Sequence, residues 1–270
     1  MMRTAGRSIA IPLIIAVFAV APALMRASNS GALGSGTLGS DDSAANCANE
    51  AAKDTSDEAS RLIVTGDFNR DGIADMAEVV WPDCKHAGAG FLSVSLGQRD
   101  GTFKHVASNP AVGHDPKAMV VGDFNGDGNP DLIVGDGDGS LTEFRGDGTG
   151  KLVAVGAIAR FSSVASIAMS DFNHDGILDL AVSDPSSSSV TILLGSGNGS
   201  FQHAWSFPLP MKGIAFRVAA ADFNGDGIID LAVTNDEDAA YEIMLGNGNG
   251  TFTYAPALSN VKDPNSHCPA

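Results

Sequence analysis

The pattern of apolar and polar positions repeats four times between residues 61 and 256. Each copy contains four short apolar runs separated by Gly, Asn or Asp. In the last copy these runs are Ile214–Ala221, Ile229–Thr234, Tyr241–Leu245 and Thr251–Ala255. Short runs rich in β-branched residues and bounded by turn residues are typical of strands. The pattern therefore predicts four antiparallel strands in every copy.

Two sequence motifs recur in phase with these runs. A DxNxDGxxD motif occupies residues 67–75, 123–131, 171–179 and 222–230. A glycine-rich motif follows each time, at residues 96–103, 145–152, 194–201 and 245–252. It predicts a hairpin between the third and fourth strands, with positive φ at Asn198-Gly199 and Asn249-Gly250.

Four strands in a repeat of about 50 residues match the blade of a β-propeller. We therefore expect an all-β fold, a propeller-like array of four four-stranded antiparallel blades. The expected blades lie at about 61–108, 117–157, 164–206 and 214–256.

Seven of the 13 phenylalanines recur at two equivalent places. Four follow the first Asp of the DxNxDGxxD motif and three leave the hairpin: Phe68, Phe124, Phe172 and Phe223, then Phe103, Phe201 and Phe252. A blade needs neighbours to cover its faces. We therefore expect these seven rings to pack between blades.

The DxNxDGxxD motif carries the oxygen ligands of a calcium loop. Side-chain oxygens stand at positions 1, 3, 5 and 9, a backbone carbonyl is available at position 7, and Gly at position 6 allows a sharp turn. The candidate ligands are Asp67, Asn69, Asp71, Ile73 and Asp75; Asp123, Asn125, Asp127, Asn129 and Asp131; Asp171, Asn173, Asp175, Ile177 and Asp179; and Asp222, Asn224, Asp226, Ile228 and Asp230. We therefore expect about four Ca²⁺ ions as cofactors.

Two other interpretations compete with a calcium loop. An EF-hand needs a bidentate Glu at position 12 and flanking helices. That position is Glu78 in the first copy but Val134, Val182 and Val233 in the others, and the flanks are strand-like. Plain Asx turns would explain the same residues without a metal. Three carboxylates within nine residues repel one another, and all four copies keep all three, which favours calcium.

The two motifs together resemble the FG-GAP/VCBS repeats of extracellular bacterial proteins, which are related to the calcium-loop blades of integrin α-chain propellers. The resemblance is carried by GDFNRDGIAD, GDFNGDGNPD, SDFNHDGILD, ADFNGDGIID and the LGxGxGxF turns, and covers residues 61–255. It implies a β-propeller with Ca²⁺ in the loop between the first two strands of each blade. Such propellers commonly have about seven blades. A chain with four is a small closed ring, an open arc, or half of a homo-oligomer that completes the propeller.

The net charge of the chain limits the classes of partner that it can bind. The 270 residues include 32 acidic and 16 basic side chains, with a formal net charge of −16. This balance excludes a nucleic-acid binder that works through a basic surface. Twelve of the 32 acidic residues are loop aspartates at positions 1, 5 and 9. The acidic excess is therefore largely local, and it predicts a bound metal rather than a cationic partner.

Residues 1–23 are typical of a signal peptide. Arg3 and Arg7 precede an apolar run from Ile9 to Leu24, and Ala21-Pro22-Ala23 has the form of a cleavage site. An uncleaved membrane anchor is the alternative, although the run is shorter than the roughly 20 residues that a span needs. We expect a secreted, periplasmic or cell-surface protein. Its remaining parts are a flexible linker at 24–60, the repeats at 61–256 and a C-terminal tail at 257–270.

Three weaker signals accompany the repeats. Cys47, Cys84 and Cys268 allow one disulfide and a spare thiol in an exported protein. The first copy has extra residues around Pro82–His86, which predict either a disulfide-tethered surface loop or a binding loop. The tripeptide Arg145-Gly146-Asp147 matches an integrin ligand, but it coincides with the hairpin turn that every copy contains.

The sequence contains no G-x-S-x-G, HExxH, P-loop or other catalytic signature. Its paired carboxylates are already accounted for by the metal loops, so none is left for an acid/base pair. We expect a non-enzymatic, calcium-stabilised binding or adhesion scaffold with a protein or glycan partner. The alternative is a carbohydrate-active protein, a lectin or polysaccharide lyase, built on the same repeats. Side chains that could stack on sugars are few and do not recur in phase: Trp81, Trp205, Tyr241 and Tyr254.

Overall fold

The computed structural model describes residues 62–80, 90–108, 110–209, 216–235 and 240–255. Every regular element in these ranges is a β-strand. The chain divides into two units, residues 1–41 and 42–270, and all of the strands belong to the second. None of the described residues forms a helix long and apolar enough to cross a bilayer.

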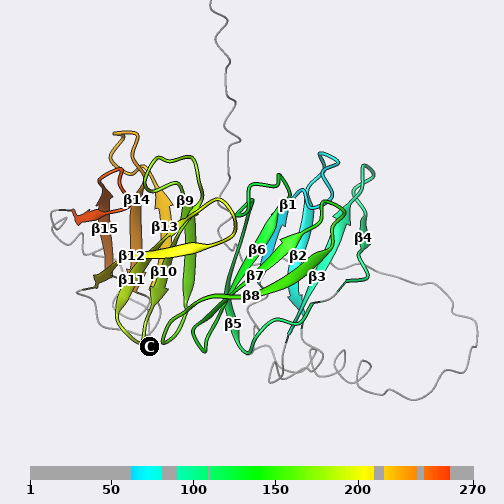
Figure 1. Cartoon of the computed structure of the whole chain (residues 1–270), viewed down its shortest axis with the longest axis horizontal. Helices are drawn as coiled ribbons and strands as arrows, with labels where there is room; N and C mark the ends of the chain where they lie inside the picture. Colours follow the sequence, from blue (N-terminus) through cyan, green and yellow to red (C-terminus); the bar gives the residue numbers. More distant parts are fainter. Residues whose placement is uncertain (1–61, 81–89, 109, 210–215, 236–239, 256–270) are drawn as a thin grey trace, which may run out of the picture. The chain divides into compact units, whose positions relative to one another are not determined.

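Four antiparallel sheets follow one another along the chain (Figure 1). The first contains β1 (Ile63–Gly66), β2 (Asp75–Val80), β3 (Phe91–Gly97) and β4 (Phe103–His105). The second contains β5 (Pro116–Gly122), β6 (Asp131–Asp136), β7 (Ser140–Gly146) and β8 (Leu152–Arg160). The third contains β9 (Ser166–Ser170), β10 (Asp179–Asp184), β11 (Ser189–Gly195) and β12 (Phe201–Pro208). The fourth contains β13 (Phe216–Ala221), β14 (Asp230–Asn235), β15 (Ala240–Gly246) and β16 (Phe252–Tyr254). Strands pair in chain order within each sheet, which confirms the predicted array of four-stranded antiparallel blades.

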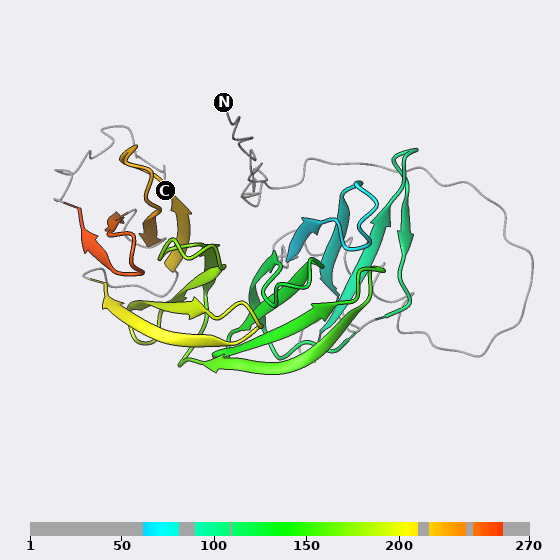
Figure 2. The same cartoon turned by 45° about the horizontal axis from the view of Figure 1, so that its top comes forward.

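The DxNxDGxxD motif joins the first two strands of each sheet. Gly66 pairs with Asp75 in the first sheet and Ser170 with Asp179 in the third, so position 9 is the first residue of the second strand. The glycine-rich motif joins the third and fourth strands. The fourth strands differ in length, since β8 and β12 are much longer than β4 and β16 (Figure 2).

The hairpins turn at glycines rather than at asparagines. Gly197 and Gly199 have φ angles of 72° and 84°, and the equivalent glycines of the fourth sheet have 72° and 79°. The prediction of positive φ at Asn198 and Asn249 is therefore wrong. Asn198 instead stabilises the turn with its side chain, because its Oδ1 accepts a hydrogen bond from the Ser200 N–H at 2.9 Å.

Three hydrophobic cores lie between consecutive sheets. Side chains alternate between the two faces of a strand, so Leu132 of β6 faces the first sheet and the adjacent Ile133 faces the third. Each core combines residues of two neighbouring sheets: Val79 with Leu132, Ile133 with Leu180, and Ile192 with Val233. A middle sheet thus contributes to two cores, as expected for stacked repeats.

The recurrent phenylalanines divide into interior and terminal residues. Phe68, Phe124 and Phe172 are buried in the three cores, and Phe201 and Phe252 pack edge-to-face against Phe124 and Phe172. The prediction that all seven pack between blades is wrong for two of them: Phe103 in the first sheet is 57% exposed, and Phe223 in the fourth is 49% exposed. Among the described residues, no sheet precedes the one that carries Phe103 and none follows the one that carries Phe223.

Several predictions fall outside the described residues. These are the signal peptide at 1–23 with its cleavage site, the linker at 24–60, the C-terminal tail at 257–270, the first-copy loop around Pro82–His86, and the pairing of Cys47, Cys84 and Cys268.

Candidate metal-binding loops

Side chains at positions 1 and 3 of each loop gather around one backbone N–H. In the first loop, the Asp71 N–H donates to Asp67 Oδ1 and to Asn69 Oδ1, each at 3.0 Å. The other oxygen of Asp67, Oδ2, accepts from the Gly72 N–H at 2.9 Å. Asp71 Oδ1 in turn accepts from the Ile73 N–H at 2.8 Å. These bonds bring the first, third and fifth side chains of the motif together on the loop surface.

The other three loops repeat this arrangement. The N–H groups of the fifth-position residues donate to both the first and the third side chain: Asp127 at 3.2 and 2.8 Å, Asp175 at 3.1 and 3.0 Å, and Asp226 at 3.2 and 2.9 Å. The four loops therefore present one local geometry, as their common motif predicts.

Position 4 of each loop adopts a left-handed backbone conformation that the motif did not indicate. Arg70 and His174 have φ angles of 60° and 61°, and Gly126 and Gly225 have 75° and 80°. The glycines in two copies were a signal of this requirement. Arg and His at the same place obscured it, because they adopt this conformation at a cost of about 1–2 kcal/mol.

The ninth-position aspartates are buried, and backbone N–H groups hold both of their oxygens. Asp179 Oδ2 accepts from the Phe172 N–H at 2.9 Å, and Oδ1 accepts from the Gly195 N–H at 2.8 Å. The equivalent bonds in the other repeats join Asp75 to Phe68 and Gly97, Asp131 to Phe124 and Gly146, and Asp230 to Phe223 and Gly246. Position 9 therefore ties the loop to the end of the third strand. Each carboxylate oxygen has two lone pairs, so its role as a metal ligand stays a prediction.

Two of these aspartates have a raised pKa because they are buried. It raises the pKa of Asp131 to about 6 and that of Asp179 to about 6. The backbone N–H donors oppose this shift because they favour the ionised form. Loop carboxylates nearby, Asp127 in the second loop and Asp175 in the third, add to it by like-charge repulsion.

The loops fit a hard cation through the chemistry of their donors. Each combines the carboxylates of positions 1 and 5, which are exposed or half-exposed, with an amide oxygen and a backbone carbonyl, the oxygen donors that Ca²⁺ prefers. Within the part of the chain that the structure describes, no three His, Cys, Asp or Glu side chains form a metal-binding group.

Each of the first three loops is also bonded to the next sheet. The Gly150 N–H of the second hairpin donates to the Phe68 carbonyl of the first loop at 3.0 Å. The Gly199 N–H donates to Phe124 and the Gly250 N–H to Phe172 in the same way, at 2.9 and 3.0 Å. The loop of one repeat and the hairpin of the next therefore form a continuous hydrogen-bonded edge.

Comparison with known protein families shows which family has this repeated arrangement. The model of the FG-GAP-like repeat matches four times, at residues 67–134, 123–182, 171–233 and 222–269. The chain belongs to the FG-GAP-like repeat family. Each FG-GAP-like match starts at a first-position aspartate, and the first three extend through the loop of the following repeat. This overlap agrees with the bonds between a loop and the next hairpin. No curated protein matches the chain.

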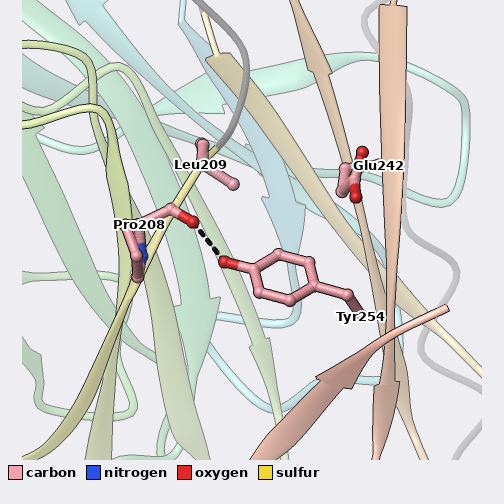
Figure 3. Close-up of a pocket in the computed structure, with 4 residues that line it drawn as sticks. All are labelled: Pro208, Leu209, Glu242 and Tyr254. Atoms are coloured by element: carbon pink, nitrogen blue, oxygen red, sulfur yellow. Dashed lines mark hydrogen bonds between the residues drawn. The ribbon is translucent and has the colours of Figure 1, made fainter. Parts of the chain in front are cut away.

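A small cavity lies where the third and fourth FG-GAP-like repeats meet (Figure 3). It measures about 330 Å³ and is lined by Pro208, Leu209, Glu242 and Tyr254. The Tyr254 hydroxyl donates a hydrogen bond to the Pro208 carbonyl. Burial raises the pKa of Tyr254, and the Glu242 carboxylate adds to the rise. The cavity is mostly apolar and its hydroxyl is already bonded, so its residues serve the packing between the two sheets.

The Arg145-Gly146-Asp147 tripeptide is part of a hairpin, as its position in the repeat predicts. Arg145 Nε donates to the buried Glu143 carboxylate at 2.9 Å. Asp147 Oδ1 accepts from the Thr149 N–H at 2.8 Å and stabilises the turn. Both charged side chains of the tripeptide are thus engaged within the chain.

Proposed function

We propose that this chain is an exported, calcium-binding, non-enzymatic repeat scaffold that binds a protein or glycan partner. The observation that carries the calcium proposal is the loop geometry repeated four times, in which the first and third side chains meet at one N–H. Residues at positions 1, 3, 5, 7 and 9 would hold the ion. Bound Ca²⁺ would neutralise the loop carboxylates and cross-link the loop.

The binding role is supported by family membership. FG-GAP-like repeats generally form non-enzymatic scaffolds with propeller-like sheets. A fold supplies a platform rather than a function, so the partner is left to experiment. The proposed export is supported by the N-terminal sequence and by the resemblance to repeats of extracellular proteins.

Counting bound calcium tests the proposal. Equilibrium dialysis at about 1 mM Ca²⁺, an extracellular concentration, should give about four ions per chain. Asp171→Ala should remove one ion, because it takes the first ligand from the third loop. Asp138→Ala changes an exposed aspartate outside the loops and should leave the count unchanged. A wild-type chain that binds no calcium would refute the proposal.

A carbohydrate partner is the second candidate. Trp205 on β12 is 52% exposed, and a flat exposed indole is suited to stacking on a sugar ring. Screening the purified chain on a glycan array tests this directly. Binding that Trp205→Ala abolishes would support a lectin-like role, and an array without signal would leave a protein partner.

A further inference from the structure

Among the described residues, the first and the fourth sheet each have one face that no neighbouring sheet covers, whereas the inner sheets are covered on both faces. We define the C-face as the side of the fourth sheet that points away from the third. It carries Ala219, Ala232, Tyr241, Ile243, Leu245 and Phe223. Glu242 and Met244, which alternate with these residues on β15, face the third sheet. Tyr241 and Phe223 are 48% and 49% exposed.

The C-face has the composition of a face built for packing. The matching side of the third sheet carries Ala168, Ala181, Ile192, Leu194 and Phe172, and all five belong to the core shared with the fourth sheet. The C-face repeats all five of these residue types at the equivalent positions of the fourth sheet, as Ala219, Ala232, Ile243, Leu245 and Phe223. Its apolar surface therefore continues an interface that already exists within the chain.

The opposite end of the array presents a complementary face. We define the N-face as the side of the first sheet that points away from the second, with Ile63, Thr65, Met76, Glu78, Ser95 and Phe103. The matching residues of the second sheet are apolar and lie in a core or against it: Met119, Val121, Leu132, Val134, Phe144 and Leu152. The N-face keeps three apolar residues and replaces Val121, Val134 and Phe144 with polar ones.

The first hairpin also lacks the bond that its counterparts make. The Gly150, Gly199 and Gly250 N–H groups all donate to a loop phenylalanine of the preceding repeat. The Gly101 N–H instead donates to Gln98 of its own turn at 2.9 Å, and the space where its Cβ would stand is open. No equivalent bond to the Phe223 carbonyl is present among the described residues.

We propose that the N-face of one chain packs on the C-face of a second copy, and so repeats the interface between consecutive sheets. Phe223 of one copy would cover Phe103 of the other, as Phe172 covers Phe252 within the chain. Interfaces between separate chains are more polar than cores, which agrees with the polar residues of the N-face.

A second copy is the occupant because each chain carries one face of each kind, and no sheet among the described residues covers either face. The contact is head-to-tail, so two copies that form it twice close a ring of eight sheets. The proposal does not depend on calcium, since it uses the sheet faces and the hairpin.

Mixing two variants provides the test. Phe103→Asp blocks the N-face and Phe223→Asp blocks the C-face. Both side chains are exposed, so each variant should fold, which circular dichroism would check. By analytical ultracentrifugation, the wild-type chain should have twice the mass of one chain and each variant alone should be monomeric. An equimolar mixture should form one-to-one dimers, because one intact face of each kind is available.

Val153→Asp is the matched control. Val153 is 62% exposed on β8, away from both faces, and its replacement should leave the dimer intact. A monomeric wild-type chain at high concentration would overturn the proposal and leave either face to another partner or to closure within one chain. A Phe103→Asp variant that still dimerises, or a mixture that stays monomeric, would overturn it as well.

Discussion

Asp179 Oδ1 lies 2.8 Å from the backbone nitrogen of Gly195 and joins two motifs that are 16 residues apart. The same bond links Asp75 with Gly97 and Asp230 with Gly246, each at 2.8 Å. The acidic loop and the glycine-rich hairpin are therefore parts of one hydrogen-bonded unit. This explains why the two motifs keep their phase through four repeats.

The buried carboxylate should matter for stability even without metal. Asp179→Ala leaves the N–H groups of Phe172 and Gly195 without their acceptor, at a cost of about 1–3 kcal/mol each. We expect a loss of about 3 kcal/mol in the free energy of unfolding, measured by urea denaturation in the presence of a chelator. Asp175→Ala, at the exposed fifth position, should cost much less. Equal losses would contradict the structural role of position 9.

The hairpin glycine should tolerate no side chain. A Cβ at Gly195 would overlap the Leu178 carbonyl oxygen, and the backbone cannot move away without breaking the bond to Asp179. Gly195→Ala should therefore destabilise the chain by about 3 kcal/mol. Gly176→Ala is the comparison: its φ is 83° but its surroundings are open, so backbone strain of about 1–2 kcal/mol is the only cost. Thermal denaturation should show a larger loss of stability for Gly195→Ala than for Gly176→Ala, and the reverse order would contradict the prediction.

Phe172 and Phe223 have the same neighbours in the sequence, but replacing them should change the stability of the chain by very different amounts. Phe172 is buried and packs on Phe252 with ring centroids 5.5 Å apart, whereas Phe223 is exposed. Phe172→Ala should cost about 3–5 kcal/mol because it leaves a cavity in the core. Phe223→Ala should cost less than about 1 kcal/mol at concentrations where the chain is monomeric. Similar losses for both would show that a following element covers Phe223.

Asp136 should make stability fall as the pH rises through neutrality. It is buried at the end of β6, its Oδ1 has no hydrogen-bond partner among the residues that the structure describes, and burial raises its pKa to about 7. The carboxylates of Asp138 and Asp115 add to the rise, while Lys117 is paired with Asp115 at 2.7 Å. The folded chain therefore keeps a proton on Asp136 at a pH where the unfolded chain has lost it.

This linkage sets the size of the effect. A group with a pKa of about 7 in the folded state raises the unfolding equilibrium constant about tenfold between pH 6 and 8. Asp136→Asn resembles the protonated form and cannot ionise. Between pH 6 and 8, its unfolding equilibrium constant should therefore rise about tenfold less than that of the wild-type chain. Asp184→Asn in the third sheet is the control, because Ser163 and backbone N–H groups already bond to that carboxylate. Parallel profiles for wild type and Asp136→Asn would contradict the prediction.

Local sequence was sufficient to predict the sheets and the loops. Glycine at position 6 and the Asx residues before it determine the turn through bonds within the motif, as between Gly72 and Asp67. The β-branched runs that flank each turn determine the strands. These features depend on residues close together in the chain, and the strands and the place of each turn were predicted correctly.

Features that depend on distant partners could not be predicted in this way. Phe172 and Phe223 share the sequence Asp-Phe-Asn, and only the presence of a following sheet decides which ring is buried. The burial of Asp179 likewise depends on Gly195 in another strand. The sequence therefore predicted the ninth-position aspartate as a metal ligand, whereas the structure shows that this aspartate accepts a hydrogen bond from the hairpin.

The calcium dependence of the melting temperature tests the central claim most directly. With sites of about 0.1 mM affinity and about 1 mM Ca²⁺, each occupied loop should stabilise the folded chain by roughly 1.4 kcal/mol. Four loops approach about 6 kcal/mol, which is comparable to the whole stability of a typical domain. Calorimetry in Ca²⁺ and then in excess chelator should show a fall of many degrees, restored when Ca²⁺ is added back. An identical melting temperature in both conditions would contradict the assignment of the four loops as calcium sites.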